Sequence, residues 1–177
     1  MNRSILVALL LLIFVDCLHA NVNKSNKLAF FNVTNDYVLE AKKEIAQNDD
    51  ISQRAKEVAL NFPQDLLLAV AALESAYGTS KKARKDNNFV GMTKSKDSKI
   101  SYRKFKDPKE CFVETLENLA KNEAYYLIQK KIINGEDDSK ALVNELVGTY
   151  VVGDDEYAKK ITDIIRQNKL SRFNDAV

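Results

Sequence analysis

The chain has 177 residues, a formal net charge of +2 at pH 7, one histidine and two cysteines. This length suits a single domain with a sizeable core, and no internal repeat or low-complexity linker indicates a second domain. If residues 1–20 are removed as argued below, His19 and Cys17 leave with them, so the mature chain keeps only Cys111. That composition excludes histidine-dependent triads, zinc sites built on histidine or several cysteines, and an intrachain disulfide. We expect no metal and no cofactor.

Residues 1–20 have the pattern of a secretory signal peptide. A short basic region containing Arg3 precedes eleven apolar residues, Ile5 to Val15, and Ala20 offers a small residue at a cleavage point. Eleven apolar residues are too few to span a bilayer. We therefore predict an exported protein, periplasmic or secreted, whose mature chain starts at Asn21 and has no transmembrane segment.

Residues 21–49 are predicted to form an N-terminal lead-in and a packing helix. Residues 21–34 are polar at first and are expected to be extended, whereas residues 35–47 carry apolar side chains at helical spacing. A second helix is predicted over residues 50–61. Both helices are expected to pack around a central helix.

The central helix is predicted over residues 63–78. Pro63 suits its first position, Asp65 complements the helix dipole, and Gly78 follows where the chain would leave the helix. Every residue from 66 to 73 is apolar, which is typical of a helix buried on all sides. Glu74 is the first charged residue after this run, so it is expected where a buried helix reaches the surface.

The position of Glu74 favours a general acid. Desolvation disfavours the ionised form of a carboxyl group, and such surroundings are of the kind that raises a carboxyl pKa. A carboxylic acid still protonated near neutral pH is what general acid catalysis requires. The alternative is a helix-end carboxylate bonded to nearby backbone, to Lys81 or to Lys82.

A short basic helix and a small lobe are predicted next. Thr79 or Ser80 can cap a helix that ends at Asn87 and Asn88, and residues 90–105 fit a small twisted hairpin or extended loop. Between residues 81 and 106, ten lysines and arginines face two acids. Such a patch attracts polyanions, here cell-wall glycan or a surface polymer rather than nucleic acid, or it is only a solvated face.

Further helices are predicted towards the C-terminus. Asp107, Pro108 and Glu110 form a strong helix start, and this helix is expected to run to about Lys121. Other helices are expected over residues 124–133, from 138 or 139 to 147, and from 153 onward, before a short polar tail. The predicted fold is mainly α: a helical bundle around a buried central helix, with a small hairpin or loop lobe.

Four ordered motifs carry a family resemblance. They are LLLAVAALESAYGTSKKARKDNNFVGM (66–92), YRKFKDPKE (102–110), NLAKNEAY (118–125) and GTYVVGDDEYAKKITDII (148–165). With them, the chain from about residue 51 to the C-terminus resembles the glucosaminidase domain family of bacterial peptidoglycan hydrolases, in the lysozyme-like superfamily. The resemblance implies an α+β lysozyme-like fold and a glucosaminidase-like catalytic domain over residues 50–177.

The resemblance also implies residue roles. Glu74 becomes the catalytic acid, acting on β-1,4 bonds next to N-acetylglucosamine in peptidoglycan glycan strands. The family often places a second acid in the small lobe, where this chain offers only Asp97, whose alternative role is to cap a turn. Tyr150 matches a family tyrosine that could orient the sugar or the water, or is simply a buried aromatic residue. Tyr125 and Asn88 are expected to line the cleft.

Several alternatives stay open. If Asp97 is not the base, the substrate's own N-acetyl group could assist, or the enzyme could be a lytic transglycosylase. From another class, the chain could be a catalytically inactive secreted wall-binding protein on the same scaffold. A Ser-x-x-Lys pattern at Ser101 and Lys104 is discounted, because an odd offset on an extended strand points the two side chains to opposite faces. We expect a monomer.

Overall fold

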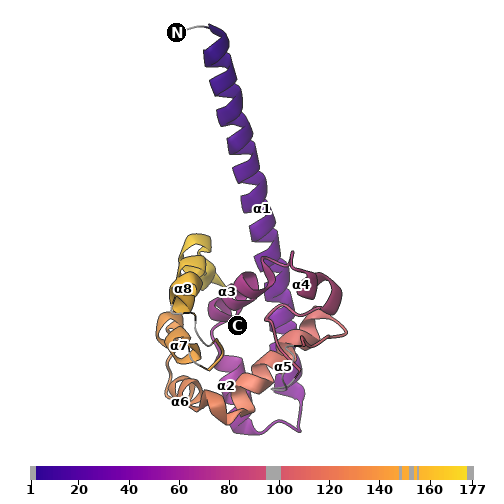
Figure 1. Ribbon diagram of the computed structural model, residues 1–177. Coiled ribbons are helices and arrows are strands. Elements are labelled where there is room, and N and C mark those ends of the chain that lie inside the picture. The colour runs from indigo at the N-terminus through magenta and orange to yellow at the C-terminus, as the bar shows by residue number, and fades with distance from the viewer. Residues whose placement is uncertain (1–2, 95–100, 148, 152–153, 155, 175–177) are drawn as a thin grey trace.

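The computed structural model describes residues 3–94, 101–147, 149–151, 154 and 156–174, with side chains described from residue 24 onward. Within these residues the chain is mainly helical (Figure 1). Its elements are α1 (Arg3–Gln47), α2 (Gln53–Asn61), α3 (Gln64–Ser75), α4 (Lys81–Asp86), α5 (Pro108–Lys121), η1 (Glu123–Tyr125), α6 (Tyr126–Ile133), α7 (Ser139–Leu146), α8 (Tyr157–Asn168) and η2 (Leu170–Phe173). Among residues with described side chains, no helix has the length and apolar character needed to cross a membrane.

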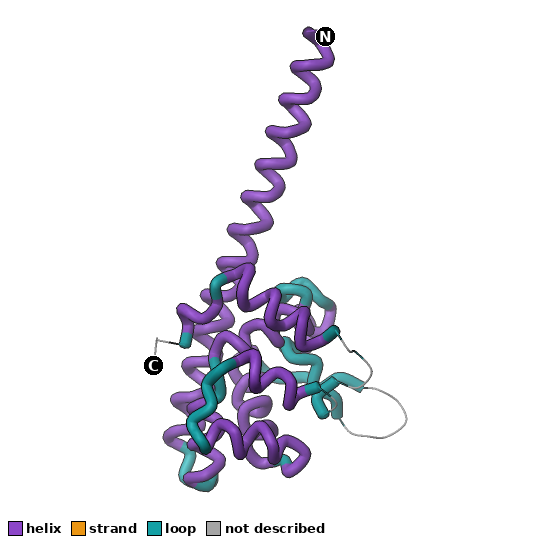
Figure 2. Tube along the Cα trace, turned by 90° about the vertical axis from the view of Figure 1, so that its left-hand side faces the viewer, coloured by secondary structure: helices purple, strands orange, loops and turns teal. Residues whose placement is uncertain are grey.

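Helix α1 is longer than the sequence predicted. Residues 21–34 belong to it, so the expected extended lead-in is wrong. The segment contains no glycine or proline, and its inward face already begins at Phe31, which is buried together with Val38, Ala41 and Ile45. Figures 1 and 2 show α1 running along the helical body and projecting beyond it towards the N-terminus.

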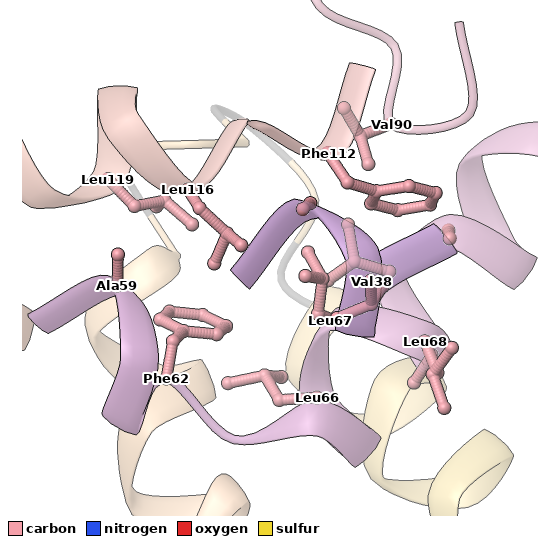
Figure 3. Packing of buried hydrophobic residues seen from close by; sticks show 14 of the residues in the cluster. Val38, Ala59, Phe62, Leu66, Leu67, Leu68, Val90, Phe112, Leu116 and Leu119 are labelled. Carbon is pink, nitrogen blue, oxygen red and sulfur yellow. The ribbon is translucent and has the colours of Figure 1, made fainter. Parts of the chain in front are cut away.

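Helix α3 forms the centre of the body, as predicted. It contacts α1, α7, α8 and η2, and its residues from 64 to 72 are buried. Leu66 lies beside Phe62 and Leu67 beside Val38 of α1 (Figure 3), in the same core cluster as Leu116 of α5. Pro63 is the N-cap rather than the first helical residue. This packing fixes the far end of α3, where Glu74 lies.

The helix starts follow local capping signals. The Ser80 hydroxyl accepts a hydrogen bond from the Ala83 amide at 3.2 Å and begins α4. The Asp107 carboxylate accepts from the Glu110 amide at 2.8 Å, while the Glu110 carboxylate accepts from the Lys106 amide at 2.6 Å. The predicted starts of α4 and α5 are therefore confirmed.

A small lobe lies between α4 and α5. Thr93 and Tyr102 form an isolated antiparallel bridge, and the Arg103 amide donates to the Met92 carbonyl at 2.9 Å. These contacts confirm a hairpin-like lobe in its described arms. The predicted fold class, mainly α and lysozyme-like with a small lobe, is also confirmed.

The C-terminal tail was expected to be short and polar, but part of it packs into the core. Leu170 and Phe173 are buried in the core. The Asn174 side chain accepts a hydrogen bond from the Asp65 amide at 2.9 Å, and the Ser139 hydroxyl donates to the Asp65 carboxylate. The tail therefore holds the first turn of α3 in place.

Candidate active site

A groove of about 890 Å³ lies beside the C-terminal end of α3. Its walls come from α3, α4, the hairpin lobe, α5, η1 and residues 149–151. The polar and aromatic side chains among its lining residues are those of Glu74, Lys82, Thr93, Tyr102, Arg103, Thr115, Asn118, Asn122, Tyr125, Thr149 and Tyr150. Glu74 is the only carboxylate among the described lining residues.

The backbone after Glu74 turns sharply. Ala76, Tyr77 and Gly78 have φ of 50°, 54° and 75°, a left-handed conformation that is costly for the first two. The Ser75 hydroxyl holds this turn, because it donates to a carbonyl one turn earlier at 2.6 Å and accepts from the Gly78 amide at 2.7 Å. The turn ends α3 at Ser75, one residue after Glu74, and the Glu74 side chain lines the groove.

The Glu74 side chain is 24% exposed and makes an ion pair with Lys82. The Lys82 ammonium lies 3.3 Å from Glu74 Oε2, and its own side chain is 18% exposed. The sequence offered Lys82 as the partner of a purely structural glutamate. The contact is present, yet both side chains also line the groove, so the ion pair does not remove Glu74 from a position where it can meet a ligand.

Gly91 provides the space that these two groups occupy. A Cβ at this position would lie 2.9 Å from Glu74 Oε2 and 2.8 Å from Lys82 Nζ. Gly91 also has a φ of +72°, which favours glycine. The last glycine of the first motif therefore suits the left-handed backbone, and it leaves room for the present positions of the Glu74 and Lys82 end groups.

Tyr150 lies in the groove wall near Glu74. Its hydroxyl donates to the Val90 carbonyl, and its ring centre lies 6.4 Å from that of Tyr157. Burial raises the pKa of Tyr150 well above its ordinary value, so the phenol is a neutral donor at physiological pH. A role for Tyr150 in orienting sugar or water stays a prediction.

The two expected cleft residues have different positions. Tyr125 is buried in the groove wall, and burial raises its pKa. Asn88 is fully buried and does not line the groove, so that expectation is wrong. Its amide nitrogen donates to the Met92 and Arg103 carbonyls at 2.8 and 3.0 Å, and its oxygen accepts from the Met92 amide at 3.0 Å. These bonds satisfy the buried amide group of Asn88, as is usual for buried polar side chains. They also join the two arms of the lobe.

Asp97 lies outside the described residues, so its proposed role as a base stays a prediction. The sequence reasoning missed several lining residues, among them Tyr102, Arg103, Asn118 and Thr149. Each of these lies inside one of the motifs that carried the resemblance. Motif membership was therefore the available signal, although it did not say which side chains face the groove.

The helical body and its groove define a lysozyme-like domain. The chain belongs to the glucosaminidase family of glycoside hydrolases: the family model described as mannosyl-glycoprotein endo-beta-N-acetylglucosaminidase matches residues 50–170. The crystal structure of the catalytic domain of the autolysin Auto from Listeria monocytogenes has a similar fold, with a TM-score of 0.62 and 19% identity over 84% of this chain and 87% of that chain. No curated protein matches this chain significantly. The family predicted from the motifs is confirmed.

Proposed function

We propose that the protein is an exported peptidoglycan hydrolase that cleaves β-1,4 glycosidic bonds next to N-acetylglucosamine, with Glu74 as the general acid. The observation that carries this proposal is the position of Glu74, the only carboxylate among the described residues of a groove large enough for sugar units. Membership of the glucosaminidase family supports the class of bond. The autolysin with a similar fold supports peptidoglycan as the source of the glycan.

In the proposed reaction, protonated Glu74 donates its proton to the departing glycosidic oxygen. The bond between that oxygen and the anomeric carbon breaks while positive charge builds up on the sugar ring. A water molecule then adds to the anomeric carbon and gives up a proton to a base. The buried α3 and the turn fixed by Ser75 hold the acid in place during this step.

The base in this scheme is Asp97. In the alternative, the acetamido oxygen of the substrate attacks the anomeric carbon, and the Glu74 carboxylate left after proton donation takes the proton of the water that later replaces it. Asp97 lies in the sequence between Thr93 and Tyr102, the two described arms of the small lobe, and both of these residues border the groove. Tyr150 is proposed to position the sugar or the water from the wall near Glu74, and Tyr125 to contact the sugar.

A second candidate is lytic transglycosylation. It is favoured by the observation that the described groove residues include one carboxylate, because that reaction does not require a base to activate water. In this case a hydroxyl group of the substrate attacks the anomeric carbon and gives its proton to the Glu74 carboxylate left after proton donation, and the product carries an intramolecular acetal at its end instead of a reducing end.

We propose export on the basis of the signal-peptide pattern of residues 1–20, and export would bring the protein to its proposed substrate. We propose a periplasmic or secreted monomer whose mature chain starts at Asn21. N-terminal sequencing of the protein recovered outside the cytoplasm tests this start.

Product analysis tests the proposed function. The purified chain from residue 21 onward is incubated with peptidoglycan, and the soluble fragments are analysed by mass spectrometry and by borohydride reduction. Hydrolysis next to N-acetylglucosamine gives fragments with reducible N-acetylglucosamine ends. Non-reducible ends would identify a transglycosylase. Binding without any released fragment would contradict both activities and identify a wall-binding protein.

A further inference from the structure

Lys82 differs from the other basic residues of α4. Lys81, Arg84 and Lys85 are exposed, whereas the Lys82 side chain turns into the groove and is 18% exposed. Its ammonium lies 3.3 Å from Glu74 Oε2 and 4.9 Å from the ring centre of Tyr102. Lys82 is therefore held between an anion and an aromatic face beside the proposed general acid.

The positive charge of Lys82 lacks an anionic partner when Glu74 is protonated, as the proposed reaction requires. A general acid must carry its proton, and a protonated Glu74 is neutral. Lys82 then loses its anion while most of its side chain stays out of water, and an unpaired cation in such a place is costly. The Tyr102 ring offsets part of this cost by a cation–π contact.

The groove offers Lys82 no other anion among its described residues. Glu74 is the only carboxylate there, and the second cation, Arg103, forms an ion pair with Glu114 of α5. A replacement anion must then come with the bound ligand.

We infer that Lys82 binds a carboxylate of the substrate, which replaces Glu74 as the partner of Lys82 when Glu74 holds its proton. The inference rests on the proposed function and specifies its substrate: a glycan that carries acidic groups, such as a strand with free stem-peptide carboxylates, in preference to an uncharged N-acetylglucosamine oligomer. The acidic group and the Glu74 carboxylate compete for the one Lys82 ammonium, so only one of them is its partner at a time.

Binding to the Glu74→Gln variant tests this inference, because glutamine resembles the protonated acid and leaves Lys82 without an anion. The probes are soluble peptidoglycan fragments with free stem-peptide carboxylates, and the same fragments after conversion of those carboxylates to methylamides. We expect Glu74→Gln to bind the acidic fragments about tenfold more tightly than the methylamides, as one charge-assisted contact allows. Wild-type protein should show a smaller preference.

Lys82 variants made in the Glu74→Gln background separate a direct contact from general attraction. Lys82→Met and Lys82→Gln should both reduce the preference to about twofold or less, whereas Lys82→Arg should keep most of it. Lys85→Met is the matched control, since it removes an exposed charge from the same helix and should leave the preference unchanged. Circular dichroism spectra confirm that each variant is folded.

Two outcomes would overturn the inference: no preference in Glu74→Gln, or a preference that Lys85→Met lowers as much as Lys82→Met does. Cleavage by the wild-type protein is scored separately. Cleavage of both fragments without any binding preference would support the proposed hydrolase function and contradict the inferred role of Lys82. A Lys82-dependent preference without cleavage would contradict the hydrolase function and support the role of Lys82 in binding a carboxylate.

Discussion

Gly91 brings the backbone close to the Glu74–Lys82 pair. An alanine there would place its Cβ within 2.9 Å of Glu74 Oε2. We expect Gly91→Ala to lower glycan cleavage at least about tenfold through displacement of the carboxylate, and to cost about 1 kcal/mol of stability because φ is positive. Cleavage rate and thermal unfolding are the measurements.

Gly135 supplies the matched control for Gly91. It has a φ of +85°, and a Cβ there would meet nothing within 4 Å. Gly135→Ala should therefore lose about the same stability, roughly 1 kcal/mol, and keep its activity. Equal activities in the two variants would show that the position of Glu74 does not depend on Gly91.

Tyr150 and Tyr157 form a second matched pair. The Tyr150 hydroxyl donates to the Val90 carbonyl, whereas the buried Tyr157 hydroxyl has no hydrogen-bond partner among the described residues. Tyr150→Phe should lower the free energy of unfolding by about 1 kcal/mol, and Tyr157→Phe should leave it unchanged or raise it slightly. Denaturant unfolding of both variants measures this, and the reverse order of stabilities would contradict the assigned hydrogen bond.

At the scale of elements, Lys42 links α1 to the end of α2. Its ammonium donates to the Leu60 and Phe62 carbonyls at 2.8 and 2.9 Å, and burial lowers the pKa of Lys42 from 10.5 to about 8. At a pH between these two pKa values, Lys42 holds its proton in the unfolded chain and has lost it in the folded chain. The contribution of Lys42 to the free energy of unfolding should therefore rise from about pH 8 to pH 10.5, by up to about 3 kcal/mol.

Comparison with Lys42→Met isolates this effect from the other titrating groups. Tyr125, Tyr150, Tyr157 and Cys111 have raised pKa values in the folded protein and act in the opposite direction at alkaline pH. The difference in unfolding free energy between wild type and variant should be constant below pH 8 and should then shift in favour of the wild type. A difference that does not change up to pH 10.5 would contradict the lowered pKa.

The elements differ in how well local sequence predicts them. The ends of α3 and α5 follow signals within a few residues, such as the Asp107 cap and the apolar run before Glu74, and both were predicted. The start of the inward face of α1 was not, because Phe31 is recognisable as a core residue only from its contact with Tyr77, whose ring centre lies 5.8 Å away. Similarly, the motif that contains Asn88 predicted a residue that lines the cleft, but the hydrogen-bond partners of Asn88 are backbone groups of the lobe.

At the scale of the whole molecule, α1 is part of the folded body although the family model begins at residue 50. Its four buried apolar residues, Phe31, Val38, Ala41 and Ile45, pack into the common core, and α1 contacts α2, α3 and α5. Burial of one large apolar side chain contributes about 1.5–3 kcal/mol, against a typical total stability of about 5–15 kcal/mol. The body therefore depends on this helix.

Two truncated chains test that dependence. A chain that starts at Asn21 keeps all four buried residues and should unfold cooperatively on heating. A chain that starts at Asp50 keeps the region of the family model but loses α1, and it should show no cooperative transition. A sharp transition in the shorter chain, measured by circular dichroism or calorimetry, would show that α1 is an appendage.

The most direct test of the whole account is the rate at which Glu74→Gln releases soluble fragments from peptidoglycan. Glu117→Gln is the control, because Glu117 pairs with Lys121 on α5 and does not line the groove. Loss of a general acid should lower the rate of Glu74→Gln at least about a hundredfold while its circular dichroism spectrum stays that of a folded protein, and Glu117→Gln should keep full activity. A Glu74→Gln variant that retains more than about a tenth of the wild-type rate would contradict proton donation by Glu74.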